Sequence, residues 1–297
     1  MKTKNRIYES GGVITEADGA YCTLRLRLPA GITTAASLRV LCEIIEQFGL
    51  SDIHLTTRQT VEIPHINPQI LADLGDALAG AGWMVGAERN EVVNITACPG
   101  TDRCKLANID CIALAREIDA KYFGKEMPGK VRIAVSACPN SCVSETLNEI
   151  GITGIKAPDR DEGYCTGCGT CVQYCREDAL CVREGRVVMD KKLCLACGTC
   201  VRACVFGTLG EAATGYRITL GGKRGRHPRV GEHLITVKTA EAALTVVDCI
   251  IDWIYRYASF EKMIVEQIGQ ELELPVLKAS LEKKLNADDI IVSGILF

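Results

Sequence analysis

A duplicated cysteine pattern constrains the fold of this chain more than any other feature of its sequence. The spacing C-x2-C-x2-C-x3-C occurs twice between residues 165 and 204, and the surrounding segment 158–209 is dense in cysteine and glycine with few long apolar runs. A segment of this kind buries too little apolar surface to fold alone, so bound metal must replace the missing core. We therefore expect an inserted module with its own organisation.

The same spacing is used by bacterial ferredoxins, in which three close thiolates hold one 4Fe-4S cluster and the fourth serves the other cluster. The predicted ligand sets are Cys165, Cys168, Cys171 and Cys204 for one cluster, and Cys194, Cys197, Cys200 and Cys175 for the other. A zinc ribbon is the alternative, but it uses two pairs of thiolates. The chain departs from the ferredoxin pattern at Arg176 and Val205, where ferredoxins usually have proline.

A second cysteine set precedes the module. Cys98 and Cys104 lie in ACPGTDRC, Cys138 and Cys142 lie in ACPNSC, and both pairs begin with a Cys-Pro step. Four thiolates that arrive from two strand ends can hold one further 4Fe-4S cluster between two loops. The remaining cysteines are expected to be small buried side chains: Cys22, Cys42, Cys111, Cys181 and Cys249.

The bulk composition excludes several classes of protein. The N-terminal MKTKNRIYESGG is followed by no apolar stretch, so we expect no secretory signal and a cytoplasmic chain, whose seventeen cysteines are metal ligands or thiols rather than disulfides. The apolar segments 244–255 and 290–297 are too short or too interrupted to span a membrane. A net charge of −3 predicts no general attraction to nucleic acid or to an anionic membrane.

Apolar periodicity outside the module predicts alternating strands and helices. Residues 21–28 alternate leucine with arginine, as a strand with one apolar and one basic face would. Further strands are predicted at 53–63, 92–97, 131–136, 216–220 and 233–237. Helices are predicted at 34–48, 70–81, 105–123 and 241–257, with a helical C-terminal tail.

The upstream cysteine set resembles that of the sirohaem-dependent sulfite and nitrite reductases in both spacings, both Cys-Pro steps and their order. LRLRLPAGITT and TTRQTVEIPHI resemble the ferredoxin-like half-domain of that family, ERNEVVNITACPG its cluster loop, and GGKRGRHPR its C-terminal loop. A ferredoxin module inserted at this point is similar to the C subunit of anaerobic sulfite reductases and to small relatives of it.

The resemblance implies an α+β fold with four parts. A ferredoxin-like half-domain covers residues 1–75, and a sirohaem/4Fe-4S domain is divided between 76–157 and 210–297 by a bacterial-type two-cluster ferredoxin module at 158–209. The implied activity is the six-electron reduction of sulfite to sulfide, with electrons relayed through three 4Fe-4S clusters to a sirohaem bridged by Cys142. Nitrite reduction to ammonia and a non-catalytic electron-transfer subunit are the alternatives.

By motif position the resemblance also assigns basic residues. Those expected at the substrate are Arg25 or Arg27, Arg58, Arg89, Lys130 and Arg132. Those expected on the carboxylates of sirohaem are Arg58, Lys223, Arg224, Arg226 and Arg229. Family members usually have lysine where Arg132 stands, and a guanidinium scarcely releases a proton. The alternatives are solvated strand faces and, for the loop 221–229, a nucleic-acid patch.

Partners follow from what the sequence contains. Larger family members carry two copies of the half-domain and cluster-domain repeat, whereas this chain has one, so we expect a homo-oligomer or a hetero-complex. Because no glycine-rich nucleotide turn is evident, an external protein or subunit must donate the electrons. The four histidines have no metal spacing and are expected to be structural.

Overall fold

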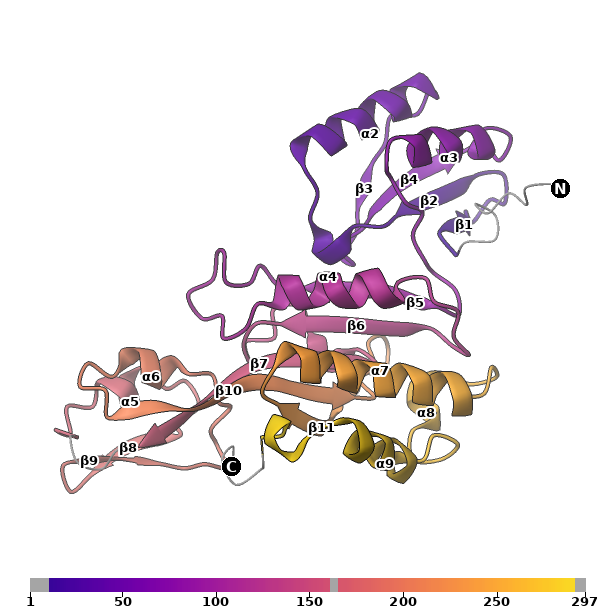
Figure 1. Cartoon of the computed structure of the whole chain (residues 1–297). Helices are drawn as coiled ribbons and strands as arrows, with labels where there is room; N and C mark the ends of the chain where they lie inside the picture. The colour runs from indigo at the N-terminus through magenta and orange to yellow at the C-terminus, as the bar shows by residue number, and fades with distance from the viewer. Residues whose placement is uncertain (1–10, 161–164, 292–297) are drawn as a thin grey trace. The chain divides into compact units, whose positions relative to one another are not determined.

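The computed structural model of the chain describes residues 11–160 and 165–291 (Figure 1). The N-terminal segment 1–10 and most of the apolar segment 290–297 lie outside these residues. The chain forms two compact units: one comprises residues 1–96, 115–133 and 254–272, and the other comprises residues 97–114, 134–253 and 273–297. Within the described ranges, no helix combines the length and apolar character that crossing a bilayer requires.

A four-stranded antiparallel sheet forms the N-terminal part of the first unit, with the strand order β1-β2-β4-β3. Its elements are β1 (Val13–Thr15), β2 (Cys22–Leu26), η1 (Pro29–Gly31), α2 (Ala35–Gln47), β3 (His54–Leu55), β4 (Val61–Ile66) and α3 (Leu71–Gly80). Both helices cover the same face of the sheet (Figure 1). Leu24, Leu26 and Ile63 are fully buried beneath them, which confirms the predicted apolar face of β2.

Either Thr33 or Thr34 could cap this helix by sequence, and the structure has Thr34 as the N-cap of α2, because its side chain accepts a hydrogen bond from the Ser37 N–H at 3.1 Å. The expectation of a buried side chain was wrong for Cys42, which is exposed on α2 beside the buried Leu41. It holds for Cys22, Cys111 and Cys249, whereas Cys181 is only half-buried.

Two predicted elements were wrong in their bounds. The strand at 53–63 is instead the hairpin β3–β4, because Thr56 and Thr60 close a turn through a 2.6 Å contact between their hydroxyls, with Gln59 at a φ of 58°. This turn places Arg58 at its tip. The helix at 105–123 begins only at Cys111, where Asp110 accepts a hydrogen bond from the Ala113 N–H at 3.0 Å.

The larger sheet has five strands in the order β11-β10-β7-β6-β5. They are β5 (Val92–Ala97), β6 (Val131–Ser136), β7 (Ile150–Arg160), β10 (Leu209–Leu220) and β11 (Glu232–Val237). The remaining elements outside the module are α4 (Cys111–Tyr122), η2 (Glu145–Leu147), α7 (Ala240–Tyr257), α8 (Ile264–Gln267), α9 (Leu274–Lys284) and η3 (Ala287–Asp289). The bounds of β5 and β6 are those predicted, because both are continuous buried runs.

The cysteine-rich module lies at the far end of the long antiparallel pair β7–β10 (Figure 1). It consists of α5 (Thr170–Gln173), the hairpin β8 (Leu180–Arg183) and β9 (Arg186–Met189), and α6 (Thr199–Ala203). Each short helix follows a glycine in the left-handed region, Gly169 or Gly198, at a φ of 76° or 72°. The small core of the module contains Cys171 and Cys200 themselves, so its interior is organised around thiols.

Candidate functional site

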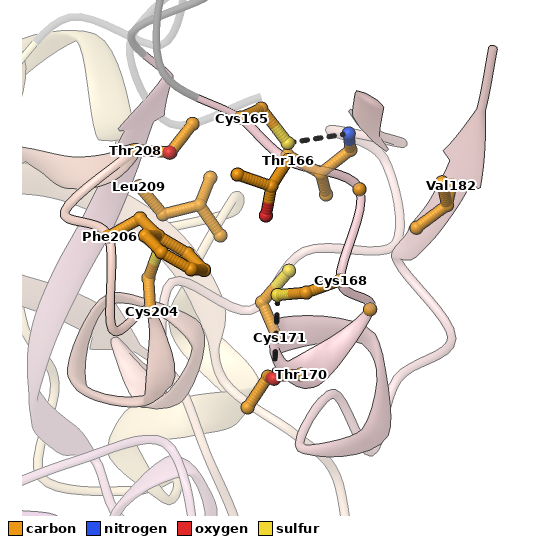
Figure 2. Close-up of a pocket in the computed structure, with 13 residues that line it drawn as sticks. Cys165, Thr166, Cys168, Thr170, Cys171, Val182, Cys204, Phe206, Thr208 and Leu209 are labelled. Atoms are coloured by element: carbon orange, nitrogen blue, oxygen red, sulfur yellow. Dashed lines mark hydrogen bonds between the residues drawn. The ribbon is translucent and has the colours of Figure 1, made fainter. Parts of the chain in front are cut away.

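Four thiols of the module surround a first hollow of about 340 Å³ (Figure 2). They belong to Cys165, Cys168, Cys171 and Cys204. The Val187 N–H donates to the Cys165 sulfur at 3.3 Å. Burial raises the pKa of Cys171, and the neighbouring Cys204 and Cys168 thiols raise it further. The hollow therefore joins three thiols of the first cysteine run with the fourth thiol of the second.

A second hollow of about 360 Å³ joins three thiols of the second cysteine run with the fourth thiol of the first. It is lined by Cys175, Cys194, Cys197 and Cys200. Burial raises the pKa of Cys200 to about 12, with further contributions from the thiols of Cys194, Cys197 and Cys175. The division of the eight thiols between the two hollows is thus the one that the ferredoxin spacing predicts.

The thiols of the upstream set also lie together, around Cys138. Burial raises the pKa of Cys138, and the thiols of Cys104, Cys98 and Cys142 add to the shift. Cys98 and Cys138 are buried, Cys104 is half-buried and Cys142 is exposed. One thiol of the four is therefore open to a second group, while the buried pair is shielded from water.

In none of the three sets do the described thiols converge on a single point, as the ligands of one metal ion would. Within residues 11–160 and 165–291, no three histidine, cysteine or acidic side chains are grouped so that they could hold a metal ion. The module thiols instead line the walls of the two hollows.

A fifth cysteine touches the upstream set, which the sequence did not predict. The sulfur of Cys111 lies 3.5 Å from that of Cys98 and 3.3 Å from the Cys98 carbonyl oxygen. The hydrogen bond from Cys111 lowers the pKa of Cys98 to about 6. Cys111 belongs to no ligand spacing, so its only sequence signal was its position shortly after the Cys104 loop.

The basic loop 221–229 contacts the chain immediately after Cys142 through Arg224. The guanidinium of Arg224 donates to the Val143 carbonyl oxygen at 2.5 Å, and Arg224 is itself exposed. Lys223 and Arg229 pair through their backbones across the base of this loop, and Arg226 is exposed near its tip. A group that carries many carboxylates would meet complementary charge here, so the chain's own residues fit a sirohaem bound next to Cys142.

Glu145, three residues after Cys142, is a second residue that the sequence did not predict. Its buried carboxylate accepts hydrogen bonds from the hydroxyls of Ser136, Ser141 and Thr153 at 2.6, 2.7 and 2.8 Å. A buried carboxylate needs such partners. These bonds fix the turn that carries Cys142 to the strands on either side of it.

Within the first unit, three of the predicted substrate residues converge on one carboxylate. Arg58 and Lys130 each lie 2.6 Å from Glu88, and Arg25 contacts both Glu88 and Glu62. Burial alone would raise the pKa of Glu88, but hydrogen bonds from Lys130 and Arg25 and the charge of Arg58 lower it to about 2. Three cations face two carboxylates, so one positive charge remains.

The other predicted substrate residues lie outside this group. Arg27 pairs with Asp119, and its guanidinium lies 4.7 Å from the centre of the Phe123 ring. Arg89 is exposed in the loop that precedes β5, and Arg132 is half-buried on β6. Of the two arginines between which the sequence could not choose, Arg25 is therefore the one grouped with Arg58 and Lys130.

Three histidines have structural partners. His54 contacts Glu62 at 3.1 Å, His65 contacts Glu16 at 3.0 Å, and His233 contacts the Thr236 hydroxyl at 2.9 Å. These contacts agree with the structural role expected of them.

Replacing Glu88 with glutamine is expected to lower the free energy of unfolding at neutral pH by about 2 kcal/mol. A carboxylate whose pKa falls from 4.5 to about 2 on folding contributes stability above pH 4.5 and loses it as the pH falls through this window. The difference between wild type and Glu88→Gln should therefore be full at pH 7 and shrink below pH 4.5. Denaturant unfolding followed by circular dichroism measures it. Glu117→Gln, at an exposed site on α4, is the matched control, and equal stability of Glu88→Gln and wild type at pH 7 would contradict the prediction.

Comparison with known proteins identifies both parts of the chain. A profile of the nitrite/sulfite reductase ferredoxin-like half domain matches residues 14–81, and one of the nitrite and sulphite reductase 4Fe-4S domain matches residues 88–282. An uncharacterised protein of Methanocaldococcus jannaschii is 36% identical over 251 residues, which cover 84% of this chain and 86% of that protein.

Two relatives with assigned activities are longer than the matched region. A coenzyme F420-dependent sulfite reductase of Methanocaldococcus jannaschii is 33% identical over 82% of this chain, which spans 38% of that protein. The C subunit of the anaerobic sulfite reductase of Salmonella typhimurium is 29% identical over 57% of this chain and 54% of its own length. The chain therefore spans only part of either relative.

Solved structures share the fold. The crystal structure of dissimilatory sulfite reductase I matches 92% of this chain and 71% of its own with a TM-score of 0.71 at 17% identity. The NirA protein of Mycobacterium tuberculosis matches 98% of this chain and 49% of its own with a TM-score of 0.64 at 16% identity. With the two domain matches and the relative that is 36% identical, this chain belongs to the nitrite and sulfite reductases, an α+β family of oxidoreductases whose cofactors are iron–sulfur clusters and sirohaem.

Proposed function

We propose that the chain is the catalytic subunit of a sirohaem sulfite reductase, which reduces sulfite to sulfide by six electrons. The observation that carries this proposal is the grouping of Cys98, Cys104 and Cys142 around the buried Cys138, with Cys142 exposed beside the basic loop. The Cys142 sulfur would then be a ligand both of a 4Fe-4S cluster and of sirohaem. The anion-binding group at Glu88 supports a substrate that is itself an anion.

The three thiol sets each hold one 4Fe-4S cluster in this proposal. The last cysteine of each run lies at the hollow of the other run, which supports two ferredoxin-type clusters. A zinc ribbon takes its thiolates as two pairs, whereas each hollow of the module is lined by three thiols of one run and one of the other. With clusters bound, the module would supply electrons to the Cys98 set, and Cys142 would connect that set with the haem.

When bound, sirohaem supplies the iron at which the sulfur–oxygen bonds of sulfite are reduced. The residues proposed to hold its carboxylates are Arg58, Lys223, Arg224, Arg226 and Arg229. Arg25 and Arg58 bind the substrate anion by charge-assisted hydrogen bonds, with Arg89 and Arg132 adding positive charge. Lys130 holds a proton at Nζ, because each oxygen of sulfite leaves as water and needs protons.

Glu88 keeps the three cations together before an anion binds. Buried cations without partners would be costly, and Arg25 is only 5% exposed. The single excess positive charge of the group favours an incoming anion. Arg27 is left out of this role because Asp119 holds it elsewhere in the first unit.

The proposal is tested on protein purified without oxygen. Iron and acid-labile sulfide analysis should give about four irons for each thiol set, and an absorption spectrum should show a haem Soret band. Turnover with a reduced viologen should consume sulfite. Turnover of nitrite alone would replace the substrate with nitrite, and protein without a Soret band after reconstitution with sirohaem would favour a non-catalytic electron-transfer subunit.

The likeness to one subunit of an anaerobic sulfite reductase supports an assembly of several chains. We propose that this chain works in a hetero-complex or homo-oligomer in the cytoplasm and takes electrons from an external protein. Light scattering on an active preparation tests the assembly, and a strictly monomeric active enzyme would contradict it.

A further inference from the structure

The two thiol sets of the module are held differently by the rest of the second unit. The loop of the Cys194 set packs directly on β7, because the Lys156 N–H donates to the Ala196 carbonyl oxygen at 2.7 Å. A Cβ atom at Gly198 would come within 2.7 Å of the Lys156 side chain, so this approach is close. Exposed apolar residues border both hollows, Val182 and Phe206 at the Cys165 set and Leu195 at the Cys194 set. The two sets differ in their thiols, because Cys168 is exposed (Figure 2) whereas every thiol of the Cys194 set is half-buried or buried.

Asn108 connects the loop of the Cys194 set with the upstream set. Its side-chain amide donates to the carbonyl oxygens of Gly154 at 3.3 Å and Cys197 at 3.4 Å, and its backbone N–H donates to the Ala137 carbonyl oxygen at 2.8 Å. The Ala137 N–H in turn donates to the Cys98 sulfur at 3.1 Å. Three hydrogen bonds and the covalent bonds between them therefore form one continuous path from the Cys98 sulfur to the peptide of Cys197.

Arg202 closes the same junction from the module side. One guanidinium nitrogen donates to the Asn108 side-chain oxygen at 3.0 Å, and the other donates to the Cys197 carbonyl oxygen at 2.9 Å. The fork thus orients the Asn108 amide, so that its nitrogen faces the Cys197 carbonyl. Asn108 precedes α4 and Arg202 lies on α6, so their pairing with Cys197 joins two segments that are far apart in the sequence.

We propose that Asn108 and Arg202 form the junction through which electrons leave the module, from the Cys194 set to the Cys98 set, so that the external donor delivers electrons at the Cys165 set. This proposal rests on the proposed function, since it requires a cluster at each set. Short hydrogen-bonded paths hold two redox centres at a fixed separation, and a small misplacement of reacting groups lowers rates strongly.

The test is the rate at which electrons cross the junction. Anaerobic stopped-flow reduction should show the broad cluster absorbance of the module bleach before the sirohaem bands change. In Asn108→Ala and Arg202→Ala, the change in the sirohaem bands should slow at least several-fold. The midpoint potentials of the clusters, measured by electron paramagnetic resonance titration, and the iron content should stay at wild-type values. Arg186→Ala, at an exposed site on the hairpin β8–β9, is the matched control and should keep the wild-type rate.

Asn108→Asp distinguishes electron transfer through the Asn108 amide from a role in which Asn108 only holds the two segments together. An aspartate keeps an oxygen for Arg202 but loses the donor to the carbonyl oxygens of Cys197 and Gly154, so it should also slow the change in the sirohaem bands. Wild-type rates in both alanine variants, loss of module iron in them, or a wild-type rate in Asn108→Asp would overturn the junction. An enzyme that transfers electrons across the junction but fails to reduce sulfite would overturn the proposed function alone.

Discussion

Cys142→Ala is expected to abolish sulfite reduction while the module keeps its iron. The change removes the one exposed thiol of the upstream set, and with it both a cluster ligand and the sulfur proposed to bridge to sirohaem. Loss of one member of a unit that acts together commonly removes nearly the whole rate, so turnover should fall by about 10⁴ or more. Total iron should fall by about four per chain if only the cluster is lost, and by about five if the sirohaem is lost with it. The Soret band should weaken or disappear.

Turnover assays with iron and sulfide analysis measure these effects on the same preparation. Cys42→Ala is the matched control, because Cys42 is also exposed but lies on α2, outside every thiol set. Its iron content, spectrum and turnover should equal those of wild type. A Cys142→Ala enzyme with wild-type turnover and full iron would remove Cys142 from the site.

Local spacing explains how much of the site the sequence could predict. A cluster ligand run is a short-range pattern, so the division of Cys175 and Cys204 between the two sets could be stated from spacing alone. Continuous buried strands such as β5 and β6 are similarly local signals. The turn at Arg58 was missed because the alternation of residues continues across it, and only the pairing of Thr56 with Thr60 divides the strand.

Charge grouping, by contrast, depends on tertiary structure. Arg25 and Arg27 are equivalent in the strand pattern, and it is the surrounding carboxylates of Glu62, Glu88 and Asp119 that separate them. The contact of Cys111 with Cys98 could likewise not be predicted from the sequence, because it depends on where α4 begins. No spacing rule describes a side chain that supports a ligand without being one.

The grouping at Glu88 connects stability with function. Glu88 occupies hydrogen-bonding positions of Arg25, Arg58 and Lys130 that an anion would use. In the proposed function, a substrate anion must compete with this internal carboxylate, which is ionised at any pH well above 2. The cost of bringing the cations together is met on folding rather than on binding, which is the usual basis of a preorganised site.

Lys130→Arg is expected to separate anion binding from proton delivery. Lys130 is half-buried and its Nζ lies 2.6 Å from Glu88. Arginine keeps the positive charge but scarcely releases a proton, so kcat should fall by about 10² while KM for sulfite changes little. Lys130→Met removes the charge as well and should also raise KM.

Steady-state kinetics with sulfite and a reduced viologen distinguish the two variants. The matched control is Lys283→Arg, the same substitution at an exposed site in the last turn of α9, which should leave both constants at wild-type values. A wild-type kcat in Lys130→Arg would assign the proton to another group. A raised KM with unchanged kcat in both Lys130 variants would instead restrict Lys130 to holding the anion, because uniform binding affects KM alone.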